Sequence, residues 1–140
     1  MKKQILTIML AALAGFSSYA QCDKKIVLSA SSTEYLNAAN EIQNTDDKTT
    51  TVEYDSKGVV IMPGEDVMEG NVNSISCDWK VPYKEGKTVI KATLTRSNGQ
   101  VMNIIITIEG KEGKLTLLAE FEEAPDRKVR LTLDKFEEKK

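Results

Sequence analysis

The sequence predicts an all-β protein of about eight antiparallel strands, arranged as an up-and-down meander that closes into a small barrel. Two observations predict this fold. Segments rich in β-branched residues alternate apolar with polar side chains, which is typical of strands buried on one face. Turn residues separate these segments at short spacing, so consecutive strands are expected to form hairpins. Closing the sheet leaves no open edge. A β-sandwich is the alternative, with a long crossover between Pro63 and Gly70 or within residues 31–48.

The N-terminal segment predicts a signal peptide over residues 1–20 and a single β-barrel-like domain over residues 21–140. Two lysines precede an uncharged apolar run over residues 5–16, which is too short to span a bilayer. Ser18-Tyr19-Ala20 supplies the small residues of a cleavage site. A buried N-terminal helix is one alternative. A lipoprotein anchored at Cys22 is another, although Tyr19 and Gln21 stand where a lipobox has an aliphatic and a small residue.

The first half of the domain offers four clear strands and one ambiguous segment. Residues 34–43 could form a short helix, or two strand ends joined at Asn37-Ala38-Ala39-Asn40. The extended form is favoured because Thr33, Tyr35 and Thr45 suit strands. The four strands are expected at Ile26 to Ala30, Thr49 to Tyr54, Val59 to Met62 and Asn71 to Lys80.

The second half predicts four consecutive strands near residues 88–96, 100–109, 114–123 and 127–135. Apolar residues occupy the even positions of the first two strands and the odd positions of the last two. Since paired residues share a face, these parities determine how many residues each loop can contain. A three-residue loop at Ser97-Asn98-Gly99 sets Leu94 opposite Met102, a four-residue loop at Gly110 to Gly113 sets Ile106 opposite Leu117, and a three-residue loop at Ala124-Pro125-Asp126 sets Phe121 opposite Val129.

The polar face of these strands excludes a membrane-spanning barrel. Lipid would have to contact this face, and it carries charged and polar residues in mid-strand. They are Lys91, Asn103, Glu120, Arg130 and Thr132. The apolar row is therefore expected inside the barrel.

The two cysteines, Cys22 and Cys77, predict one disulfide. Both lie in the mature chain, and an exported protein meets an oxidising compartment in which a pair of thiols tends to close. Trp79 shares the strand parity of Cys77 and should point inward beside the bond. Two separate buried thiols are the alternative.

The composition of the chain argues against several classes of function. The net charge of −2 is spread along the chain, so no basic footprint for nucleic acid is present. Histidine is absent, which removes the commonest general base and metal ligand. Carboxylates cluster only at Asp46-Asp47 and at Glu120 to Asp126, where a solvated hairpin edge is the expected role. The sequence therefore predicts a protein that is not an enzyme and has no metal or cofactor. An enzyme that uses these carboxylates alone is the alternative.

The strand count, hairpin order and the stretch beginning Cys77-Asp78-Trp79-Lys80 resemble small exported lipocalin-like proteins of the calycin type. This resemblance implies a barrel that holds a ligand in its interior. The first strand reads Lys25-Ile26-Val27-Leu28-Ser29, without the Gly-x-Trp motif of true lipocalins.

A non-enzymatic binding protein, periplasmic or secreted, is the expected function, with a small apolar ligand as the candidate cargo. Ala92 and Ala119 are small and are expected near Ile104, where they would leave a gap. Tyr83, on a connecting loop, is the aromatic residue best placed to contact a partner. A filled-core structural or protein-interaction module of the cell envelope is the alternative. The candidate ligand contacts are Tyr54, Trp79, Ile90, Ile104, Ile106, Leu117 and Leu131.

Overall fold

The structure is a computed structural model that describes residues 22 and 24–139. The predicted signal peptide, residues 1–20, lies outside the described residues. The described part of the chain contains eleven strands and no helix, which confirms the all-β prediction. The strands are β1 (Ile26–Ala30), β2 (Thr33–Leu36), β3 (Ile42–Asp46), β4 (Thr50–Tyr54), β5 (Gly58–Pro63), β6 (Met68–Val81), β7 (Glu85–Arg96), β8 (Val101–Lys111), β9 (Lys114–Phe121), β10 (Ala124–Thr132) and β11 (Lys135–Glu138).

All eleven strands belong to one antiparallel sheet, in the order β11-β1-β4-β5-β6-β7-β8-β9-β10-β2-β3. From β4 to β10 every strand pairs with its successor, so the predicted consecutive meander is confirmed. The connection from Gly64 to Val67 is a short turn between paired strands, not the long crossover that a sandwich would need.

The strand count differs from the prediction because three long strands bend and are interrupted. Ser31-Ser32 separates β1 from β2, and Leu133-Asp134 separates β10 from β11. The bent strand made of β1 and β2 pairs with the bent strand made of β10 and β11. The register is the same on both sides of their interruptions, since Ile26 pairs with Glu138 and Thr33 pairs with Leu131. Residues 47–49 likewise separate β3 from β4. Counting each bent strand once gives the predicted eight.

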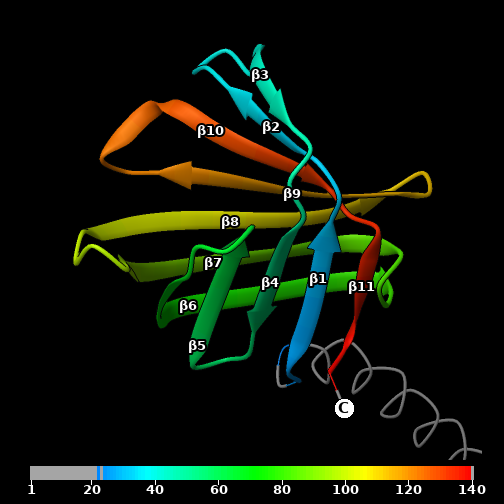
Figure 1. The fold of residues 1–140 in the computed structure, drawn as a ribbon. Helices are drawn as coiled ribbons and strands as arrows, with labels where there is room; N and C mark the ends of the chain where they lie inside the picture. The colour runs from blue at the N-terminus through cyan, green and yellow to red at the C-terminus, as the bar shows by residue number, and fades with distance from the viewer. Residues whose placement is uncertain (1–21, 23, 140) are drawn as a thin grey trace, which may run out of the picture.

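The sheet coils over itself, but hydrogen bonds do not close it. β11 and β3 are its two ends, and no ladder joins them. Figure 1 shows β5, β4, β1 and β11 crossing in front of β6, β7 and β8, with one interior between them. The two ends of the sheet are instead connected through the chain, because β2 continues β1 and β11 continues β10.

The predicted hairpin registers are right in one case and wrong in two. Leu94 faces Met102, and the Ser97-Asn98-Gly99 loop has Gly99 at φ 86°, as expected. The second loop has two residues, not four, and Ile106 faces Ala119. The third turn lies at Glu122-Glu123, ahead of Ala124, so Val129 also faces Ala119.

The ambiguous segment is extended, as favoured. β2 and β3 form a hairpin closed by the turn from Asn37 to Glu41. The side-chain oxygen of Asn37 accepts hydrogen bonds from the backbone N–H groups of Ala39 (3.0 Å) and Glu41 (2.9 Å). Such local bonding by asparagine stabilises a turn in place of a helix. Ala38 and Ala39 therefore lie in a loop despite their helix propensity.

The interior is a single apolar core to which β1 and every strand from β4 to β11 contribute. The meander strands bury their predicted even or odd positions, while Lys91 and Thr132 are exposed on the other face. The close packing of β6 on β7 depends on Gly70, where a Cβ atom would lie 1.8 Å from the carbonyl oxygen of Thr93.

Candidate functional site

The candidate ligand contacts in the middle of the sheet form a solid core. Ile90, Ile104, Ile106, Leu117 and Leu131 are all buried. Ladder pairing brings them together, with Ile90 opposite Ile106 and Leu117 opposite Leu131. Ile90 and Ile106 are 0% exposed, so no space that could admit a water molecule borders them.

The expected pair of small residues beside Ile104 is not formed. Ala92 does face Ile104, but Ala119 faces Ile106, and the residue opposite Ile104 on β9 is Phe121. The four-residue loop was the source of this error, because it displaced β9 by two positions. The larger, half-buried Phe121 therefore takes the place expected for Ala119.

The other two candidate contacts, Tyr54 and Trp79, lie at the end of the core where β6 passes β11. Trp79 is buried, as predicted, and its ring centroid lies 5.3 Å from that of Phe136. Tyr83 packs edge-on against the same phenylalanine at 5.0 Å. Tyr83 is therefore half-buried by an aromatic neighbour and is not the freely exposed residue that its loop position suggested.

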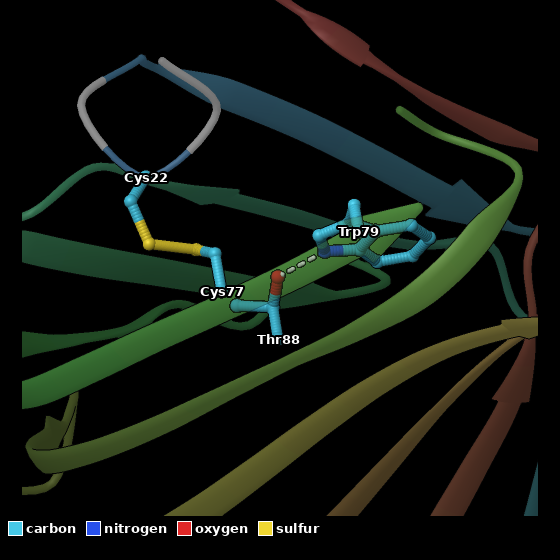
Figure 2. Close-up of a disulfide and its surroundings, with 4 residues drawn as sticks. All are labelled: Cys22, Cys77, Trp79 and Thr88. Carbon is cyan, nitrogen blue, oxygen red and sulfur yellow. Dashed lines mark hydrogen bonds between the residues drawn. A yellow bond between two sulfur atoms is a disulfide. The ribbon is translucent and has the colours of Figure 1, made fainter. Parts of the chain in front are cut away.

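A buried polar pair accompanies these rings. The indole Nε1–H of Trp79 donates a hydrogen bond of 2.7 Å to Oγ1 of Thr88, which is 0% exposed (Figure 2). Thr88 holds an inward position of β7, in line with Ile90. Its strand parity was readable from the sequence, but its role as the acceptor for the indole was missed.

The hydroxyl of Tyr54 has no hydrogen-bond partner among the described residues, although it is buried. Burial raises the pKa of Tyr54 far above its ordinary value, and the nearby Thr88 hydroxyl offsets only part of this rise. A buried hydroxyl without a partner costs free energy. Among the described residues it is the one buried side-chain polar atom without a partner, so it could exchange a bond with a ligand.

The disulfide lies at the same end of the core. Cys22 and Cys77 are bonded, with an S–S distance of 1.96 Å and a Cα–Cα distance of 5.8 Å, which confirms the predicted pair. Figure 2 shows Cys77 and Trp79 on one strand, two residues apart. A sulfur in a disulfide cannot carry a lipid, so this state of Cys22 is incompatible with a lipid anchor.

Three surface hollows in the described part of the chain have volumes of about 530, 490 and 700 Å³. Charged residues line all three. The first borders Tyr54, and none of the three is lined by Trp79, Ile90, Ile104, Ile106, Leu117 or Leu131.

The acidic clusters serve the surface of the fold. Glu123 accepts a hydrogen bond of 2.9 Å from the backbone N–H of Asn103, and Glu120 lies 3.8 Å from Nζ of Lys128. Asp46 lies 3.9 Å from Nζ of Lys48. Over residues 22 and 24–139, no three acidic or cysteine side chains converge as metal ligands would.

No protein-family model, curated protein or solved structure matches this chain. Within the described residues, no helix has the length and apolar character needed to cross a bilayer.

Proposed function

We propose that this protein is an exported, non-enzymatic binding module whose interior is filled and whose outer surface does the binding. The observation that carries this proposal is the solid core. The residues expected to contact an apolar ligand instead contact one another, and the central ones are 0% exposed. Ligand pockets are concave and largely formed in advance. A protein-interaction or structural role in the cell envelope therefore fits better than a carrier role.

Composition supports the non-enzymatic part of the proposal. The chain has no histidine, and three of the clustered carboxylates, Asp46, Glu120 and Glu123, engage in surface ion pairs or a backbone hydrogen bond. General acid and base chemistry needs groups that converge on one reacting centre. Surface carboxylates held by lysine and backbone groups have no such arrangement.

The export part rests on the N-terminal sequence and the disulfide. The pattern of residues 1–20 is that of a secretory signal, and a stable bond between Cys22 and Cys77 is compatible with an oxidising compartment. The proposed location is periplasmic or extracellular.

A small apolar ligand remains a second candidate, favoured by the orphaned hydroxyl of Tyr54. A ligand with one polar atom could reach this hydroxyl at the aromatic end of the core, if the rings of Trp79 and Phe136 separate to admit it. Its apolar part would then lie against the row that includes Ile90 and Ile106.

Titration with a long-chain fatty acid and with an apolar fluorescent dye distinguishes the two candidates. Trp79 is the single tryptophan, so its emission reports directly on the aromatic end. A filled interior predicts no saturable change in emission. A saturable change in the native protein that is lost in Tyr54→Phe would overturn the filled-core proposal and establish the carrier role.

A further inference from the structure

The β2–β3 hairpin ends in a strand with a free edge. β3 is the last strand of the sheet and pairs with β2 alone. Figure 1 shows this hairpin standing beyond the meander strands, at the top of the view. The side chains from Ile42 to Thr45 are all exposed. The outer backbone groups of β3 therefore face solvent, where another strand can pair with them.

The free edge of β3 carries little charge that would prevent pairing. Four of its five residues are uncharged, and Ile42 is an exposed large apolar residue at 52%. The opposite end of the sheet, β11, carries charge at Lys135, Glu137 and Glu138. Charged side chains on an edge discourage strand addition. Of the two ends of the sheet, β3 is the one that accepts a partner.

A β-bulge sets the length of the usable edge. Tyr35 pairs with Asn44 while Leu36 pairs with Ile42, so Gln43 has no partner in the ladder. The regular part of β3 is Asn44 to Asp46, and residues 47–49 lead into β4. An added strand would pair with about this length of chain, and Ile42 would lie at its end as an apolar contact.

The charges beside the edge select the partner. Glu41, Asp46 and Asp47 are acidic and Lys48 is basic, which gives residues 41–48 a net charge of −2. Antiparallel pairing of Ile42–Asp46 with the same strand of a second copy would set Glu41 opposite Asp47. Like charges directly opposite each other destabilise a strand pair. The edge therefore disfavours a second copy and favours a basic strand.

We propose that the free edge of β3 binds an extended, basic segment of a partner protein by strand addition. The segment donates and accepts backbone hydrogen bonds along Asn44–Asp46, and its cationic side chains lie near Asp46 and Asp47. Strand addition of this kind takes its affinity from main-chain bonds and its specificity from side chains. This inference rests on the proposed function, in which binding takes place on the outer surface.

The test uses the full mature protein and an eight-residue peptide of alternating lysine and valine. Binding is measured by calorimetry at low salt, and the contact is located by amide hydrogen exchange. We expect saturable binding that slows exchange at β3. A lysine–valine peptide of the same length and charge in which every backbone nitrogen is methylated cannot donate the strand hydrogen bonds and should not bind. A glutamate–valine peptide should also fail to bind.

Two variants of the protein sharpen the test. Asp46→Asn with Asp47→Asn removes two surface charges without altering the backbone, and should weaken the lysine–valine peptide about threefold to tenfold. Glu137→Gln on β11 is the matched control and should leave binding unchanged. Absence of binding, protection away from β3, equal binding of the N-methylated peptide, or dimerisation through β3 would each overturn the proposal. None of these results depends on whether the interior takes an apolar ligand, so the two proposals fail separately.

Discussion

Truncation of one isoleucine provides a direct test of whether the core is filled. Ile106 is 0% exposed and lies between Ile90 on β7 and Ala119 on β9. Ile106→Ala removes three carbon atoms, which accounts for about 2.4 kcal/mol at about 0.8 kcal/mol for each buried carbon. In a packed core the vacated space adds a further cost, so a total loss of about 3 to 5 kcal/mol is expected.

The neighbouring residue is a matched control of the same type on the same strand. Ile105 points to the outer face of β8 and is half-buried, opposite Lys91 and Glu120. Ile105→Ala should cost about 1 kcal/mol or less, because its side chain already contacts water. The two variants share the change in strand propensity, so their difference isolates the contribution of burial.

The assay is urea unfolding followed by Trp79 emission, with midpoint and slope determined for both variants. Ile106→Val, which removes one carbon atom, should lower the free energy of unfolding by about 1 kcal/mol. This variant still gives a measured cost of truncation if the alanine variant does not fold. A residue that lines an existing cavity loses little beyond the transfer term. A loss of about 2 kcal/mol or less for Ile106→Ala would refute the reasoning that the core is filled.

Further perturbations test other contacts. Reduction of the Cys22–Cys77 bond, whose sequence separation is 55, should lower the unfolding free energy by about 4 kcal/mol in denaturant titrations; an unchanged midpoint would contradict it. Thr88→Val leaves the tryptophan N–H unpaired and should cost about 1 to 3 kcal/mol, whereas Tyr54→Phe removes an unpaired hydroxyl and should be neutral or stabilising. Because burial raises the pKa of Tyr54 in the folded state, the native protein loses stability as the pH rises above about 10; Tyr54→Phe should lessen that loss, and an identical alkaline profile would count against it. Gly70→Ala sets a Cβ atom 1.8 Å from a backbone oxygen of β7 and should cost about 3 kcal/mol in thermal unfolding, so a cost below 1 kcal/mol would show that the strands can separate freely.

The sequence predicted the turn at Ser97-Asn98-Gly99 because only one glycine was available for the left-handed position. It failed at the next turn, where Gly110 and Gly113 compete. Gly110 lies inside β8, since a Cβ atom there would approach the carbonyl oxygen of Lys84 to 2.4 Å. The chain turns at Glu112-Gly113, where both residues have positive φ, 53° and 80°. Glycine is needed at position 110 because the backbone there contacts the loop at Lys84. Local turn chemistry cannot reveal a contact with a distant loop.

The third turn failed for a similar reason. Pro125-Asp126 is a strong local turn signal, yet the chain turns at Glu122-Glu123. The carboxylate of Glu123 and the backbone N–H of Glu122 both bond to Asn103 on β8, which fixes this corner. Pro125 instead lies in β10 where the register shifts between Ala124 and Lys128. Proline is tolerated at such an irregularity.

Less of the candidate site than of the fold could be predicted. Strand parity was sufficient to place Trp79 and Ile106 inside, because a period of two decides the face of a strand. Parity says nothing about distances across the core. The contact of Trp79 with Phe136 joins β6 to β11, which are far apart in sequence order, and the missing partner of Tyr54 depends on the side chains packed around it. The bond from Trp79 to Thr88 joins the neighbouring strands β6 and β7, but the choice of Thr88 as acceptor depends on side-chain geometry that parity does not give.

The pairing of the first strand with the last has a consequence for the order in which the chain can fold. Ile26 on β1 pairs with Glu138 on β11, so this ladder cannot form until residues 135–138 are available. Contacts of such long sequence separation slow folding, because the chain entropy is lost before the contacts form. A chain that emerges through a membrane pore with its N-terminus first would keep β1 unpaired with β11 until the very end. The pairing of β1 with β11 therefore completes the core late, and in the proposed export it would keep the polypeptide open while it is threaded.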